Sequence, residues 1–140
     1  MKMLMGAVLA VSMGIAGRAY AEKPQCEANY KQQGGFLTGR TFSTWGDVAG
    51  STQAAAFKKV YLVAAKSGLR IASADKDIGV ISAEQVSNDA KGQMTVPWNI
   101  TVEQVKGMTR VSVSKTTPPG YATSAEAQMQ GMCAVIEAAK

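Results

Sequence analysis

The chain contains no histidine among its 140 residues. Histidine is the commonest general base, the commonest metal ligand and the usual partner of a nucleophilic serine, so its absence excludes most hydrolase and metal-centre arrangements. The glycines match neither a Walker phosphate loop nor a dinucleotide-binding fingerprint. The sequence therefore predicts a protein that is not an enzyme and that uses no cofactor or metal.

Cysteine is also scarce, because the chain has only Cys26 and Cys133. Two cysteines allow a single intramolecular pairing, and no Cys-x-x-Cys motif is present to lower a thiol pKa for redox chemistry. We therefore predict a structural disulfide between them, with unpaired or intermolecular thiols and a catalytic thiol as the alternatives. Such a bridge closes a loop of about 100 residues and stabilises the fold by roughly 4 kcal/mol in the chain-entropy model.

Long apolar runs are absent after residue 21, whereas the first 21 residues resemble an export signal. Lys2 precedes an apolar run over 3–16, which is shorter than the roughly 20 residues that span a bilayer. Ala19-Tyr20-Ala21 has the small-x-small pattern that signal peptidase recognises. We predict cleavage after Ala21, a periplasmic or secreted location, and no transmembrane segment in the mature chain; an uncleaved signal anchor is the alternative.

Charge of either sign is sparse in the remaining 119 residues. Without Lys2 and Arg18 the formal net charge falls from +5 to +3, and the basic residues are scattered. A nucleic-acid-binding protein would show a clustered basic surface, so we expect no nucleic-acid partner. With 46% hydrophobic and 18% charged residues the composition is globular. We predict a signal peptide over 1–21, an N-terminal arm over 22–39 and a single, monomeric α+β domain over 40–140.

Hydrophobic periodicity predicts the elements of that domain. Ser51 or Thr52 is expected to cap the first helix, and a capping box of Thr123 and Glu126 the last one. Pro97 cannot donate to a strand ladder, so its strand is expected at a sheet edge or bulged. We expect helices over 52–67 and 123–138, and strands over 40–45, 69–74, 78–86, 94–103 and 108–115. The order β-α-β-β-β-β-α predicts an antiparallel sheet with two helices packed on one face.

One stretch of the chain resembles a pattern found in small exported bacterial domains. Gly68, Ile71 and Asp75, followed by Gly79-Val80-Ile81-Ser82-Ala83, form a glycine after a helix and then a strand hairpin. Together with the element order over 40–138, this is similar to the helix-grip or TATA-binding-protein-like topology of the BamC lipoprotein's domains. The resemblance implies an antiparallel sheet gripping two helices and an envelope setting, and it transfers no functional residues. The chain departs from those lipoproteins because it has no lipidated cysteine.

The first functional hypothesis is an exported envelope protein that acts by binding or assembly, with an envelope protein or glycan as its partner. Exposed aromatic residues and the polar face of the strand over 94–103 are the candidate contact surface. The candidate residues are Trp45, Thr95, Asn99, Thr101, Glu103 and Tyr121.

The second hypothesis is a small-ligand binder with a pocket between the sheet and the helices, which would take a lipid-like or apolar ligand. Its expected lining residues are Met94, Trp98, Tyr61 and Met129. An enzyme, the third hypothesis, would need a carboxylate pair from distant segments, such as Glu84 with Glu103. Asp75 and Asp77 are expected to make local hydrogen bonds within a hairpin turn instead.

Overall fold

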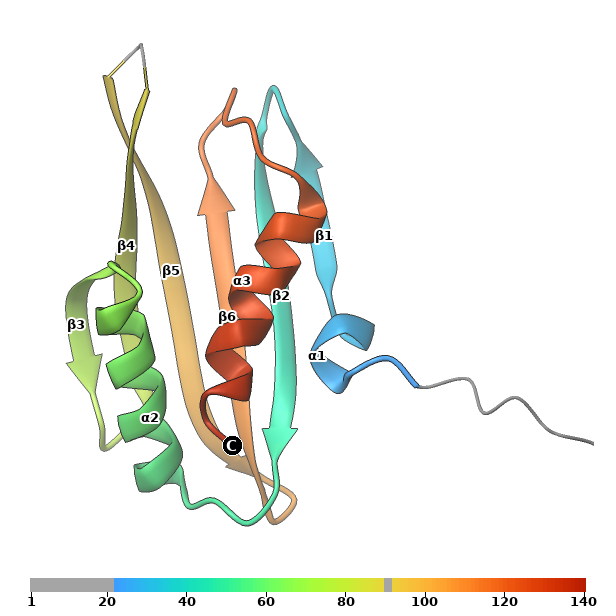
Figure 1. Cartoon of the computed structure of the whole chain (residues 1–140), viewed down its shortest axis with the longest axis vertical. Coiled ribbons are helices and arrows are strands. Elements are labelled where there is room, and N and C mark those ends of the chain that lie inside the picture. Colours follow the sequence, from blue (N-terminus) through green and yellow to red (C-terminus); the bar gives the residue numbers. More distant parts are fainter. Residues whose placement is uncertain (1–21, 90–91) are drawn as a thin grey trace, which may run out of the picture.

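Six antiparallel strands form one sheet, and the helices lie on one of its faces (Figure 1). The computed structural model describes residues 22–89 and 92–140. The export signal predicted for residues 1–21 therefore lies outside the described residues. The predicted α+β class, with its antiparallel sheet and one-sided helices, is confirmed.

The elements follow one another with short connections, and the sheet order is β1-β2-β6-β5-β4-β3. Their bounds are α1 (Gln25–Ala28), β1 (Lys31–Gly35), β2 (Gly39–Val48), α2 (Gln53–Lys66), β3 (Arg70–Asp75), β4 (Val80–Asp89), β5 (Gly92–Val105), β6 (Met108–Thr117) and α3 (Ala125–Glu137). From β2 onward this is the predicted order β-α-β-β-β-β-α. The segment expected as an arm adds the short helix α1 and the edge strand β1, which pairs with β2.

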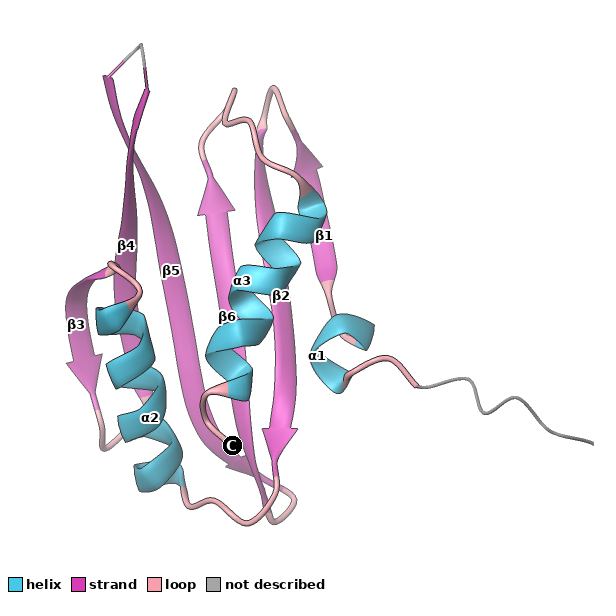
Figure 2. Ribbon diagram, viewed as in Figure 1, coloured by secondary structure: helices cyan, strands magenta, loops and turns pink. Residues whose placement is uncertain are grey.

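Alternation of side chains along the strands creates the core. In β5 the inward residues Val96, Trp98, Ile100 and Val102 are buried, as the period of two requires. They face α2 and α3, which contact each other on that side of the sheet. Within the described residues no helix covers the opposite face (Figure 2). The sheet thus has one buried face and one exposed face.

Side-chain caps start both long helices. The hydroxyl of Thr52 accepts a hydrogen bond from the Ala55 N–H at 3.1 Å. Thr52, one of the two residues predicted for this role, is therefore the cap of α2. The capping box predicted for Thr123 and Glu126 is wrong, because Ser124 caps α3 by accepting from the Ala127 N–H at 3.1 Å. The Thr123 hydroxyl instead accepts from the Gln128 side chain.

The expectation that the strand through Pro97 is an edge strand or bulged is wrong. Strand β5 pairs with β4 on one side and with β6 on the other without a register shift, and the edges of the sheet are β1 and β3. The β5–β6 ladder runs from Trp98 to Val105. Pro97 therefore lies just beyond the end of this ladder, so its missing N–H removes no hydrogen bond to β6.

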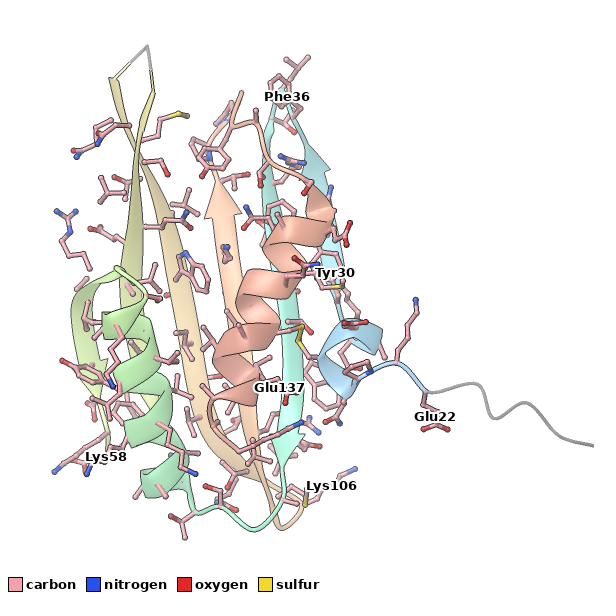
Figure 3. The ribbon with its side chains drawn as sticks, in the orientation of Figure 1. Glu22, Tyr30, Phe36, Lys58, Lys106 and Glu137 are labelled. Carbon is pink, nitrogen blue, oxygen red and sulfur yellow. A yellow bond between two sulfur atoms is a disulfide. The ribbon has the colours of Figure 1, made fainter. Side chains whose placement is uncertain are left out.

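The predicted disulfide between Cys26 and Cys133 is confirmed, with a Cα–Cα distance of 5.7 Å. It joins α1 to α3, and its sulfur atoms are drawn in yellow in Figure 3. Nearby, α3 packs so closely on β2 that a Cβ on Gly46 would lie 2.8 Å from Cγ2 of Ile136. No helix within 22–89 and 92–140 is long and apolar enough to span a bilayer.

Candidate functional site

A cavity of about 650 Å³ lies between the helices and the sheet. This volume is in the usual range of small-molecule sites. Its walls come from both long helices, three strands and the two segments that follow α2 and precede α3. The lining residues are Val63, Ser67, Gly68, Leu69, Gln85, Val86, Trp98, Lys115, Tyr121, Thr123, Ala127, Gln128, Gly131, Ala134 and Val135.

The most unusual lining residue is Lys115, which is only 4% exposed. It continues the inward alternation of Thr109, Val111 and Val113 along β6, so the sheet register places it on the buried face. Phe42 of β2 and Trp98 of β5 are its cross-strand neighbours. Its ammonium nitrogen lies 3.9 Å from the centroid of the Trp98 ring, which is a cation–π contact.

The ammonium of Lys115 has no acidic partner among the described residues. None of the described ion pairs uses it, and the cavity lining contains no aspartate or glutamate. Burial lowers the pKa of Lys115 to about 8. At neutral pH the cavity therefore contains a charged group that no counter-charge balances, and burying an unpaired charge is costly.

Other polar groups surround the cavity. Gln128 of α3 donates from Nε2 to the Thr123 hydroxyl at 2.7 Å, while its Oε1 is buried without a described hydrogen-bond partner. The indole N–H of Trp98 donates to Oε1 of Gln85 at 3.3 Å. The Tyr121 hydroxyl lies 3.3 Å from that of Ser87. The rest of the lining includes the aliphatic side chains of Val63, Leu69 and Val135, so the cavity combines aliphatic and polar groups with a cationic one.

The pocket expected from the sequence is present between sheet and helices, but only one of its four expected lining residues belongs to it. That residue is Trp98. Tyr61 instead lines a groove between α2 and β3, Met94 lines a small depression near Gly120, and Met129 does not line the helix–sheet cavity. The inward face of α3 is rotated from the expected one, so that Gln128 and Val135 are buried.

The groove between α2 and β3 has a volume of about 740 Å³. Only two elements and the turn after β3 form it, and of its lining residues only Phe57 is buried. Asp75 of this hairpin accepts hydrogen bonds from the N–H groups of Asp77 and Ile78 at 2.9 and 3.3 Å, as predicted for a local turn. A groove with exposed walls excludes little water, so we regard the helix–sheet cavity as the stronger candidate.

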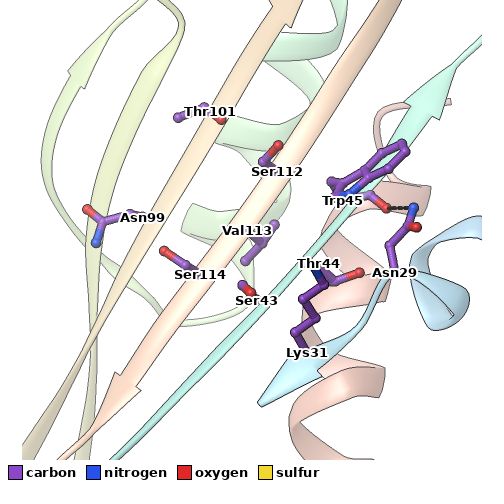
Figure 4. A pocket seen from close by; sticks show the side chains of 10 residues that line it. All are labelled: Asn29, Lys31, Ser43, Thr44, Trp45, Asn99, Thr101, Ser112, Val113 and Ser114. Atoms are coloured by element: carbon purple, nitrogen blue, oxygen red, sulfur yellow. Dashed lines mark hydrogen bonds between the residues drawn. The ribbon is translucent and has the colours of Figure 1, made fainter. Parts of the chain in front are cut away.

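The exposed face of the sheet carries a second, shallower groove of about 260 Å³ (Figure 4). Small side chains on its floor, at Ser43, Ser112 and Ser114, leave a hollow between larger ones. The register places Lys31, Ser43, Ser114, Asn99 and Ser82 in a single row across five strands. Three of the six predicted surface residues, Trp45, Asn99 and Thr101, line this groove.

Residues on both sides of β2 make contacts that fix the position of Trp45. Its carbonyl accepts a hydrogen bond from Nδ2 of Asn29 at 3.2 Å, and the Arg110 guanidinium lies 3.7 Å from its ring centroid. Arg110 also forms an ion pair with Asp47 at 2.8 Å. The hydrogen bond from Arg110 holds the pKa of Asp47 below its usual value. Trp45 was expected at the end of a strand, but it lies within β2 as a fixed part of the exposed face.

The other three predicted surface residues are not part of this groove. Thr95 lines a separate depression beside Pro97, Glu103 is exposed further along β5, and Tyr121 lies on the helix side, at the helix–sheet cavity. Glu84 pairs with Pro97 across the sheet, six residues before Glu103 on the same strand, which corresponds to about 20 Å. The structure thus keeps apart Glu84 and Glu103, the carboxylate pair given as an example for the enzyme hypothesis. Within the described residues no cluster of three metal-ligating side chains is found.

Comparisons with known proteins find solved structures of low sequence identity. No protein-family profile and no curated protein matches the chain. The conserved protein of unknown function EF2215 from Enterococcus faecalis is 12% identical with a TM-score of 0.49, over 81% of this chain and 78% of that chain. Ara h 8.0201 is 11% identical with a TM-score of 0.41, over 71% of this chain and 93% of that chain. The finer resemblance to BamC domains is not confirmed.

Sequence reasoning missed Lys115 and Gln128, the two buried polar residues of the helix–sheet cavity. A signal for Lys115 was present, because the period of two through Thr109, Val111 and Val113 continues to position 115. A lysine on an apolar strand face is the kind of local inconsistency that marks a functional position. Gln128 carries no comparable signal, since its burial depends on how α3 is rotated on the sheet.

Proposed function

We propose that this protein is an exported, non-enzymatic binding protein that takes a small amphipathic ligand into the helix–sheet cavity. The observation that carries the proposal is a cavity of about 650 Å³ that combines aliphatic side chains with the buried polar groups of Lys115 and Gln128. Well-formed apolar pockets with a few convergent polar groups are the usual form of a ligand site. The disulfide supports export, because such bonds persist in oxidising compartments.

The cavity is favoured over the exposed groove because it removes more of a ligand from water. Burial of apolar surface stabilises by about 25 cal/mol per Å², and the walls of the cavity close on a ligand from both the helix layer and the sheet. The exposed groove is less than half as large and lies on an open face. We therefore assign ligand binding to the cavity.

Filling the cavity is expected to weaken ligand binding without unfolding the protein. A Cβ on Gly131 of α3 would approach Nζ of Lys115 to 4.0 Å and meet no nearer atom, so a larger side chain there extends into the cavity. We expect the neutral fluorescent probe N-phenyl-1-naphthylamine to bind the wild type and to lose at least about tenfold in affinity in Gly131→Leu. Fluorescence titration measures this difference.

Gly131→Ala is the matched control, because a single methyl group leaves most of the cavity open. It should retain probe binding and raise the unfolding free energy by about 1 kcal/mol, since alanine has the higher helix propensity. If Gly131→Leu binds the probe as tightly as the wild type and melts cooperatively, the probe does not bind in this cavity. An absence of binding to the wild type would contradict the proposed function itself.

A second candidate function is capture of an envelope protein or glycan on the exposed face. It is favoured by the groove that brings Trp45, Asn99 and Thr101 together among small hydroxyl side chains. An aromatic ring beside amide and hydroxyl groups provides both apolar contact and hydrogen bonds to a partner.

The exposed groove makes its own testable prediction. The double variant Asn99→Ala with Thr101→Ala should reduce the amount of partner crosslinked in intact cells severalfold, at an unchanged melting temperature. Glu103→Ala is the matched control, because Glu103 is exposed on the same face of β5 but outside the groove. Equal crosslinking by both variants and the wild type, read by mass spectrometry, would place the partner elsewhere.

A further inference from the structure

We propose that the helix–sheet cavity selects an anionic amphiphile, whose carboxylate head group pairs with the ammonium of Lys115 while its apolar chain lies along the aliphatic wall. This inference rests on the proposed function and adds to it the charge and chemistry of the ligand.

The described groups around Lys115 include no negative charge. Phe42 of β2 and Trp98 of β5 face it from the neighbouring strands, and α3 contributes the neutral residues Gln128 and Gly131 to the lining. Tyr121 is the other ionisable residue of the lining. The region therefore contains a cation and no carboxylate.

A second cation lies on the same face of the sheet. The Arg40 guanidinium lies 5.3 Å from the ring centroid of Phe42, the residue opposite Lys115. It donates hydrogen bonds at 3.0 Å to the carbonyls of Tyr121 and Thr123, which belong to the segment before α3. Arg40 thus holds one wall of the cavity in place and adds positive potential. An anion entering the cavity would be attracted by both charges.

The contact of Lys115 with Trp98 compensates its charge only in part. A cation–π contact contributes about 0.5–2 kcal/mol, less than the several kcal/mol that desolvating an ammonium costs. A ligand carboxylate at hydrogen-bond distance would supply the missing counter-charge and raise the pKa of Lys115 again. An anion that pairs with Lys115 would offset the cost of this unpaired charge, and this favours its binding.

The room for such a head group comes from Gly131. This helix position has no side chain, and a Cβ built there would meet no atom nearer than the ammonium nitrogen of Lys115 at 4.0 Å. Val63 of α2 and Val135 of α3 then continue the wall as aliphatic surface. A single alkyl chain fits this arrangement of one cationic end and an apolar wall.

The test compares two ligands of equal chain length, decanoate and decanol, by their displacement of N-phenyl-1-naphthylamine at about pH 7. We expect the wild type to bind decanoate roughly tenfold or more tightly than decanol. Lys115→Met should bind both with similar affinity, because methionine keeps the apolar contact with Trp98 but removes the charge. Lys115→Arg should retain the preference, since the guanidinium is also cationic.

The outcomes separate this inference from the function on which it rests. Equal affinity of the wild type for decanoate and decanol, or an undiminished preference in Lys115→Met, overturns the anion inference and leaves ligand binding intact. Failure of both ligands and the probe to bind the wild type overturns both proposals. A tighter complex with decyltrimethylammonium than with decanoate would reverse the assigned charge. Lys58→Met, at an exposed lysine of α2, should behave as the wild type.

Discussion

Reduction of the Cys26–Cys133 disulfide is expected to lower the free energy of unfolding by about 4 kcal/mol. The two cysteines are 107 residues apart in the sequence. In the chain-entropy model, a bridge that closes a loop of this length lowers the entropy of the unfolded chain. The free energy of unfolding rises by between 4 and 5 kcal/mol at about 25 °C as a result. A domain of this size is stable by only about 5–15 kcal/mol, so the reduced protein should be close to the limit of folding at physiological temperature.

Urea denaturation of the oxidised and reduced wild type measures this difference directly. The reduced protein keeps both sulfur atoms, so the comparison isolates the crosslink from the packing of Cys26, which is 2% exposed. The double variant Cys26→Ser with Cys133→Ser should lose slightly more, because its hydroxyl groups are buried in place of sulfur. Superimposable urea transitions, with complete reduction verified by thiol quantitation, would contradict a structural role for the bridge.

Substitution of Lys115 by methionine is expected to stabilise the unliganded protein at neutral pH by about 2 kcal/mol. Burial lowers the pKa of Lys115 to about 8, against an ordinary lysine value of about 10.4. At about 1.4 kcal/mol per pKa unit the full shift corresponds to about 3 kcal/mol. Any residual hydration of the ammonium in the folded protein would reduce this figure, so we expect a gain of about 2 kcal/mol.

The same shift makes the stability of the wild type depend on pH in a defined direction. Below about pH 8 the ammonium is charged in both states, and the folded protein bears the whole cost of burying it. Between about pH 8 and 10.4 the unfolded chain retains a proton that the folded protein has released. The unfolding free energy contributed by Lys115 therefore rises with pH across this window, and the advantage of Lys115→Met should disappear towards its upper end.

Urea denaturation of both proteins between about pH 7 and 10 provides the measurement, and the difference between them isolates Lys115. Burial also raises the pKa of Tyr30, which lowers stability above about pH 10, but equally in both proteins. Lys58→Met serves as the exposed-lysine control and should parallel the wild type. A Lys115→Met variant less stable than the wild type at neutral pH, or a difference that does not change with pH, would contradict an unpaired buried ammonium.

Much of the fold was predictable because its sequence signals are local. Each strand from β2 to β6 and both long helices were expected within a few residues of their observed bounds, since alternation and three- to four-residue spacing report which residues face a core. Strand β1 was not expected, because its residues Lys31 to Gly35 have no apolar alternation. It forms through pairing with β2, and backbone hydrogen bonding leaves little trace in a sequence.

The candidate site was less predictable than the fold. The hypothesis of a pocket between sheet and helices was sound, and Trp98 was correctly expected in it. Tyr61 and Met129 were misplaced because small rotations of α2 and α3 decide which side chains face the sheet. Pro97 suggested an edge strand, yet β5 is central, because the β5–β6 ladder ends one residue after the proline. Errors of this kind concern how the elements pack against one another, and the spacing of apolar residues along the chain does not report this packing.

The sequence by itself predicted the α+β class and the pairing of its two cysteines, because each follows from composition or from a local period. Only the tertiary structure decided that Trp45, Asn99 and Thr101 share a groove and that Lys115 lies in a cavity without a counter-charge. The physical reason is that burial of a single group depends on every element packed around it. A lysine on a strand becomes a buried charge without a partner only when two strands and a helix pack around it and none of them supplies a carboxylate.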